Sequence, residues 1–322
     1  MHIPDGFLDT KTAAATGVLA AAGLAIALRQ ARRNLPPRRV PLLGLSAAFV
    51  FAAQMLNFPV AGGTSGHLMG GVLTAVLLGP SAAVIVLSAV LIVQCLMFAD
   101  GGISALGANV FNMALVGGVG GWTVYYLISR LFRGLFGRVL AATFAAWCSM
   151  VLAAVACAGE LAVSRTVGWS VAFPTMAGIH MLIGIGEGAI TALVLVAISQ
   201  TRPDLIRDPA DAAPTRPYGA MMAYGMLLSL GLAMFISPFA STWPDGLDWT
   251  AARLGFEERA RTIVPAPMPE YEVERIATSW WSTPLAGAVG TAVVFGFSWL
   301  LARILVPRTR PGEEVANPAP PQ

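Results

Sequence analysis

The sequence predicts an all-α, polytopic membrane protein, and three observations support that fold class. Of the 322 residues, 56% are hydrophobic, only 11% are charged, and the mean hydropathy is +0.71. A chain this apolar cannot hide its surface in a soluble core, so a lipid bilayer must be its solvent. Apolar runs recur along the chain, and arginines gather between them. The net charge of +3 is too small and too dispersed to indicate a nucleic-acid partner.

Nine apolar runs are read as membrane-spanning helices, because each approaches the length that crosses a bilayer. They cover residues 12–28, 41–58, 67–79, 81–98, 108–129, 139–158, 179–199, 219–238 and 283–306. The third run is short and is joined to the fourth by Gly79-Pro80, so it could instead be a half-helix. Merging the two would reverse the orientation of every later helix.

The arginines predict that the N-terminus lies outside and the C-terminus inside. In that orientation most of the 20 basic residues fall in the inner connections at 29–39, 130–138 and 200–217 and in the C-terminal tail. No cleavable signal peptide is expected, because acidic residues precede the first apolar run and arginines follow it. We therefore expect a multi-pass protein of a bacterial-type inner membrane that keeps Met1 as its first residue.

Histidine is scarce, and two of the three histidines are predicted to share the outer side. A free amine one residue before a histidine is a chelator, because the Met1 amine and the amide nitrogen and Nδ1 of His2 close fused rings around one ion. His67 can fill the fourth corner of the resulting square. Planar nitrogen coordination suits Ni(II) or Cu(II) and can accommodate Co(II), whereas Zn(II) prefers a tetrahedron. The alternative is a disordered terminus with His67 bonded to backbone.

Glycines favour the metal-site interpretation. Gly62-Gly63 and Gly66 permit the close approach of a second segment to His67, and Pro4-Asp5-Gly6 predicts a turn that folds the terminus back. Three nearby polar residues are candidates for holding the ligands in place: Thr64, Ser65 and Asn109. Asn109 and Asn112 could equally cap or bridge helices.

Other polar residues carry weaker hypotheses. His180 and Glu187 are two turns apart on one predicted helix, which leaves a proton or metal relay open, but we favour a structural bond from Glu187 to a neighbouring helix. A metalloenzyme built on this pair would lack an HExxH motif or a third ligand. The cysteines show no CxxC spacing, and Lys11, the only lysine, lies outside any Walker A motif. The chain is therefore not expected to be an enzyme or to hydrolyse ATP.

Four motifs resemble those of the CbiM/NikM family, the substrate-specific components of energy-coupling factor (ECF) transporters for cobalt and nickel. They are MHIPDG (1–6), PVAGGTSGHLMGG (59–71), ADGGISALGANVFNMA (99–114) and HMLIGIGEG (180–188). The resemblance covers residues 1–205. It implies that the Met1 amine, the His2 amide and imidazole and the His67 imidazole bind the ion. It also implies separate partners, namely a membrane coupling (T) component and ATP-binding-cassette ATPase subunits.

The remainder of the chain is similar to the small component of such systems, the NikN/CbiN-like PDGLE type. The similarity rests on STWPDGLDWTAARLGF (241–256) in a long outer loop. We therefore predict a core of about seven helices over 1–205 and a two-helix module over 206–322, with the outer loop at 239–280. A linker rich in Pro and Asp (201–217) joins them.

The function implied is high-affinity capture and membrane uptake of a divalent transition metal, with Ni(II) favoured over Co(II) and no cofactor besides the transported ion. A metal-sensing membrane receptor remains an alternative, and a membrane metalloenzyme using His180 and Glu187 a weaker one.

Overall fold

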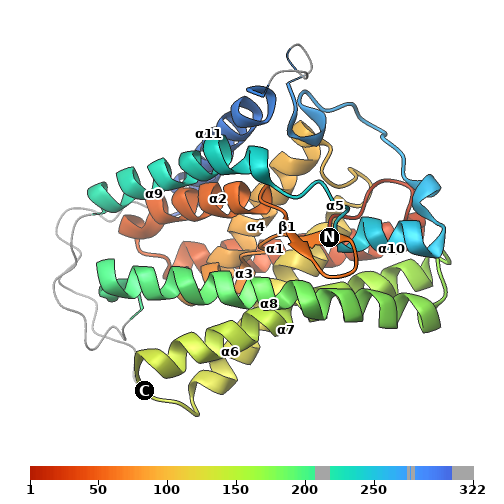
Figure 1. Cartoon of the computed structure of the whole chain (residues 1–322). Helices are drawn as coiled ribbons and strands as arrows, with labels where there is room; N and C mark the ends of the chain where they lie inside the picture. Colours follow the sequence, from red (N-terminus) through yellow and green to blue (C-terminus); the bar gives the residue numbers. More distant parts are fainter. Residues whose placement is uncertain (207–217, 274–275, 277–279, 307–322) are drawn as a thin grey trace.

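Helices make up almost all of the computed structural model, which describes residues 1–206, 218–273, 276 and 280–306 (Figure 1). Within these residues, seven helices are long and apolar enough to cross a membrane. They are α1 (Thr10–Asn34), α4 (Pro80–Phe98), the continuous helix Leu106–Ser129, α7 (Gly134–Val163), α8 (Trp169–Thr201), Gly219–Phe239 and α11 (Ser282–Leu305). The predicted all-α, multi-pass membrane fold is confirmed.

Two of these helices contain wider π-helical turns. Leu106–Ser129 consists of α5 (Leu106–Asn109), a π-helix (Val110–Gly120) and α6 (Gly121–Ser129). Gly219–Phe239 begins as α9 (Gly219–Gly231) and continues through a π segment (Leu232–Ile236). π-turns are frequent where a helix serves a functional site, and the first of these segments directly follows Asn109 and contains Asn112.

The count of nine spanning helices is not confirmed. Helix α2 (Val40–Gln54) has 15 residues and is about 22 Å long at about 1.5 Å per residue, below the roughly 30 Å of bilayer hydrocarbon. The predicted span 67–79 is wrong, because only α3 (Gly71–Leu78) is helical and eight residues cannot cross. Gly70, in the left-handed region at φ +76°, separates α3 from the loop that carries His67.

The segment between α2 and α4 nevertheless carries the chain from one end of the molecule to the other. A small hairpin of β1 (Phe58–Val60) and β2 (Thr64–Gly66) leads into α3. Just beyond α3, the Ser81 hydroxyl lies 2.6 Å from Gln30 near the end of α1, whereas Asp100 after α4 lies beside His2. A loop plus a half-helix thus replaces the predicted third span, and the direction of each later helix stays as predicted.

Buried side chains support the non-helical backbone of this segment. The Glu187 carboxylate on α8 accepts hydrogen bonds from the amides of Met69 (2.5 Å) and Gly70 (3.0 Å), and the Gln54 amide donates to the Met69 carbonyl (3.1 Å). Irregular backbone at membrane depth is tolerated only where protein satisfies its polar groups. Glu187 therefore makes the kind of structural bond that the sequence favoured, to a loop rather than to a neighbouring helix.

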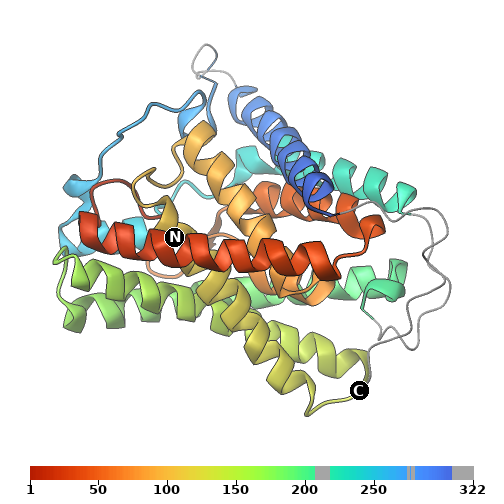
Figure 2. The ribbon, with the colours of Figure 1, turned by 180° about the vertical axis from the view of Figure 1, so that it is seen from behind.

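The C-terminal helices pack on the core around α2. Glycines make the approach close: a Cβ at Gly290 on α11 would lie 2.2 Å from the Phe51 ring, and one at Gly44 would lie 3.0 Å from the Phe295 carbonyl. Between these helices the chain runs over the end of the molecule that holds the N-terminus, where α10 (Gly246–Leu254) lies (Figure 1). Seen from behind, α1 runs across the face of the molecule nearest the viewer (Figure 2). Most of the predicted linker, residues 207–217, and the arginines at 308 and 310 lie outside the described residues.

Candidate metal site

The first residues of the chain are buried and hydrogen-bonded. Met1, His2 and Ile3 are 4%, 8% and 0% exposed. The Asn109 side chain brackets Ile3, accepting from its amide (2.8 Å) and donating to its carbonyl (3.1 Å), and the Gly102 amide donates to the same carbonyl (2.8 Å). Asn109 therefore fixes the backbone directly after His2.

The predicted turn at 4–6 is present and is fixed on both sides. The Asp5 carboxylate accepts from the Ser104 amide (2.7 Å) and hydroxyl (2.5 Å), and the Asp5 carbonyl accepts from the Arg261 amide (2.8 Å). Gly6 has φ +93°, and a Cβ there would lie 2.1 Å from the Arg259 carbonyl oxygen. Only glycine fits this position, where the terminus passes under the C-terminal module.

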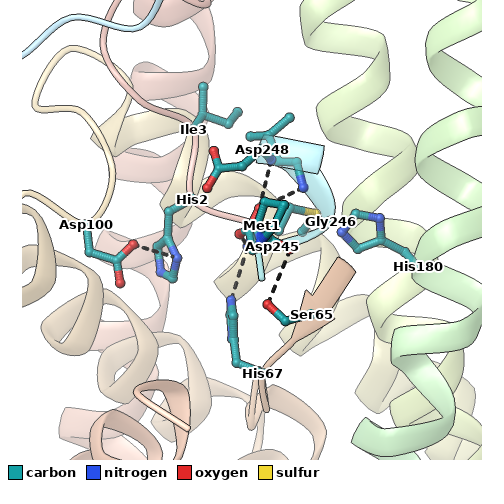
Figure 3. A network of polar contacts seen from close by, with 12 residues as sticks. Met1, His2, Ile3, Ser65, His67, Asp100, His180, Asp245, Gly246 and Asp248 are labelled. Atoms are coloured by element: carbon teal, nitrogen blue, oxygen red, sulfur yellow. Dashed lines mark hydrogen bonds and ion pairs between the residues drawn. The ribbon is translucent and has the colours of Figure 1, made fainter. Parts of the chain in front are cut away.

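The terminal amine meets His67, as the sequence predicts. The Met1 nitrogen lies 3.1 Å from Nε2 of His67, which is 7% exposed (Figure 3). Nδ1 of His67 lies 3.1 Å from the Leu68 carbonyl, an acceptor only, so the ring proton belongs on Nδ1. Nε2 then presents its lone pair to the amine.

The His2 imidazole lies beside His67 but faces different partners. The two rings stack with centroids 5.4 Å apart and planes inclined by 24°. Nδ1 of His2 lies 3.1 Å from Asp100, just beyond α4, and Nε2 lies 3.2 Å from the Gln94 side-chain oxygen. The structure thus brings Met1, His2 and His67 together, with Nδ1 of His2 paired to a carboxylate.

The amine has a second partner, Asp245, which sequence reasoning missed. The Met1 nitrogen donates to Oδ2 at 2.5 Å, while Oδ1 caps α10 by accepting from the amides of Leu247 and Asp248. Burial lowers the pKa of the amine, but the charge and hydrogen bond of Asp245 outweigh it and hold this pKa above its ordinary value. The sequence did contain a signal for this contact, because the Pro-Asp-Gly within residues 241–256 lies on the same predicted outer side as the amine.

Thr64 and Ser65 contact the C-terminal module rather than the predicted ligands. The Ser65 amide and the Thr64 hydroxyl donate to the Pro244 carbonyl (2.8 and 3.0 Å), and the Ser65 hydroxyl donates to the Trp243 carbonyl (2.7 Å). Neither side chain is bonded to Met1, His2 or His67. The expectation that they hold the ligands directly is therefore corrected: they fasten the segment that carries Asp245.

His180 and Glu187 do not form a joint site. Nδ1 of His180 bonds the Met176 carbonyl (2.8 Å), its ring packs against Gly246, and Glu187 is engaged with the loop after His67. The Asn112 amide is likewise engaged, with Glu160 (2.7 Å). Among the described residues, no group of three or more His, Cys, Asp or Glu side chains is placed to hold a metal ion. A site here therefore needs backbone donors, which the amine and the His2 amide supply.

A cavity with about 10 Å³ of free volume, room for one water molecule or one bare ion, adjoins the amine. Its walls include Met1, His67, Met69, His180 and Asp245.

Comparison with known proteins identifies two family regions. Residues 2–205 match the family described as the cobalt uptake substrate-specific transmembrane region, CbiM, and residues 219–307 match the PDGLE domain. A putative fused nickel transport protein NikMN of Archaeoglobus fulgidus is 39% identical over 94% of this chain and 98% of its own length. The fused nickel transport protein NikMN of Rhodobacter capsulatus is 33% identical over 88% and 87%.

A solved structure is also similar. A truncated transition metal transporter in crystal form shares 35% identity and a TM-score of 0.58, over 62% of this chain and 99% of that one. These relatives are metal transport proteins and not enzymes, which agrees with the missing catalytic motifs. The chain belongs to the CbiM family of substrate-specific membrane transport components and carries a PDGLE domain behind it.

Proposed function

We propose that this protein captures Ni(II), in preference to Co(II), as the substrate-binding component of an ECF-type transporter. The observation that carries the proposal is the buried approach of the Met1 amine to Nε2 of His67 at 3.1 Å. Metal–nitrogen bonds of about 2.0 Å would put adjacent corners of a square about 2.8 Å apart, so this pair is already near the spacing of two ligands.

The remaining corners belong to His2. Its amide nitrogen lies between the amine and Nδ1 along the covalent path, so one ion closes two fused chelate rings, from amine to amide and from amide to Nδ1. Four nitrogens in a plane suit Ni(II) on ligand-field grounds, and fused relatives named for nickel transport support the same preference. Energy for uptake against a gradient would come from separate ATPase subunits through a membrane coupling protein.

Calorimetric titration of the purified full chain with Ni(II) tests the site. His67→Asn is the sharpest variant, because its amide can still donate to the Leu68 carbonyl while the Nε2 ligand is lost. Its affinity should fall at least about 100-fold, and that of His67→Ala equally. Wild-type affinity in either variant would disprove the ligand assignment.

Uptake of labelled Ni(II) into cells that also make the coupling and ATPase subunits tests transport and selectivity. Equimolar Co(II) should compete poorly. Equal competition by Co(II) would show that the transporter does not prefer Ni(II). Tight binding without ATP-dependent uptake would favour a sensing receptor instead.

A further inference from the structure

The His2 imidazole and three other polar side chains form a closed ring of polar contacts. Nδ1 of His2 lies 3.1 Å from Oδ1 of Asp100, whose Oδ2 accepts from the Tyr271 hydroxyl at 2.5 Å. The Gln94 amide donates to the Tyr271 oxygen at 3.1 Å, and the Gln94 side-chain oxygen lies 3.2 Å from Nε2 of His2. Tyr271 belongs to the 239–280 loop, so the C-terminal module reaches the His2 imidazole as well as the Met1 amine.

Tyr271 determines which way the Gln94 amide points. A glutamine can present either its oxygen or its NH₂ to a histidine nitrogen, and Gln94 is fully buried, so its partners alone decide. Because the Tyr271 hydroxyl gives its proton to Asp100, its oxygen accepts the Gln94 N–H. The Gln94 oxygen is thereby turned toward Nε2 of His2.

This orientation suits the ion-bound form of His2. Both ring nitrogens face acceptor oxygens, Asp100 at Nδ1 (3.1 Å) and Gln94 at Nε2 (3.2 Å). An ion on Nδ1 takes the place of any proton there, so the one proton of the neutral ring then lies on Nε2, where the Gln94 oxygen accepts it. The Asp100 carboxylate lies beside the positive charge of that ion.

The backbone and the packing hold Tyr271 in this place. Its ring stacks on Phe98 with centroids 4.6 Å apart and an interplanar angle of 15°, and Phe51 lies 5.9 Å away. Glu270 and Tyr271 are consecutive non-glycine residues in the left-handed region, at φ +52° and +60°. Such backbone persists where the surroundings over-determine it, as at functional sites.

We propose that Tyr271 is a positioning residue for metal capture: through Gln94 it turns an acceptor oxygen toward Nε2 of His2, and through Asp100 it fixes the carboxylate beside Nδ1. This inference rests on the proposed function, because it concerns the imidazole assigned to the ion.

Tyr271→Phe tests it in the purified full chain, because the variant keeps the stacked ring and loses only the hydroxyl. Ni(II) affinity should fall about 10- to 100-fold, the usual effect of removing a group that orients a ligand. In ¹⁵N spectra of the histidine-labelled protein saturated with Ni(II), the Nε2–H resonance of His2 should move, because the Gln94 oxygen is no longer held toward it. Tyr224→Phe, an exposed tyrosine of the same module, should change neither.

Two outcomes would overturn the proposal: unchanged affinity, or lost affinity with the Nε2–H resonance of His2 unmoved, which would assign Tyr271 to packing alone. Gln94→Glu adds a rescue, because a carboxylate offers an oxygen to Nε2 in either orientation. Adding Tyr271→Phe to Gln94→Glu should then cost less than in the wild type, and an equal cost would also refute the proposal. The His67→Asn result separates these failures, since it tests the metal site without Tyr271.

Discussion

The Met1 amine lies between two groups that would have opposite effects on the proposed metal capture. Nε2 of His67 offers a neighbouring ligand, whereas Asp245 stabilises the protonated amine, which cannot coordinate. The raised pKa of the amine means that protons compete with the ion, so Ni(II) affinity should rise with pH until the amine is deprotonated.

Asp245→Asn should move this pH profile to lower pH. The variant removes the charge that raises the amine pKa, so burial then lowers it, while the asparagine oxygen can still cap α10. Ni(II) titrations from about pH 5 to well above the ordinary amine pKa of about 8 would locate the midpoint, and the histidines, near about 6.5, titrate within the same range. A midpoint that stays in place or moves to higher pH would show that Asp245 does not set the amine pKa.

The residues that meet at the candidate site could be predicted from the sequence, but their carboxylate neighbours could not. A chelate by Met1 and His2 would follow from covalent geometry, and His67 was the other histidine on the predicted outer side. Asp245 and Asp100 lie 244 and 98 positions from their partners, and only the folded chain shows which acids approach the terminus. For Thr64 and Ser65, closeness in sequence to His67 was misleading, because neighbouring side chains of a strand point in different directions.

At the scale of single elements, the segment from 55 to 79 shows why helix counting failed. Its apolar composition is compatible with a full membrane span, but equally with a loop and a half-helix that are buried in the protein. Hydropathy does not register how backbone hydrogen bonds are satisfied, and here Gln54 and Glu187 satisfy them from other helices. The predicted direction of the later helices survived because the loop and α3 together still connect the two ends of the molecule.

Glu187→Ala should therefore loosen the loop that carries His67, although Glu187 does not contact His67 itself. It leaves the amides of Met69 and Gly70 without their acceptor, at a cost of about 1–3 kcal/mol each when buried. We expect a lower midpoint of thermal unfolding and weaker Ni(II) binding, both partly restored in Glu187→Gln, whose oxygen can accept from one amide. Unchanged unfolding with abolished binding would instead make Glu187 a direct participant in the metal site.

At the scale of the whole molecule, the two ends of the chain are expected to tolerate change very differently. The N-terminus is enclosed by α4, α5, the His67 loop and the C-terminal module, so its amine is part of the interior. A tag several residues long before Met1 turns that amine into a peptide nitrogen and should abolish Ni(II) binding while membrane insertion stays normal.

One added residue is a poorer test, because an amine, two amides and the His2 imidazole could chelate without His67. A protease site that cleaves directly before Met1 provides the control, since cleavage should restore binding in the same sample. A matched tag after residue 322 should leave affinity within about threefold of wild type. If the uncleaved N-terminal tag binds Ni(II) as tightly as the cleaved chain, and still depends on His67, the amine is not a ligand.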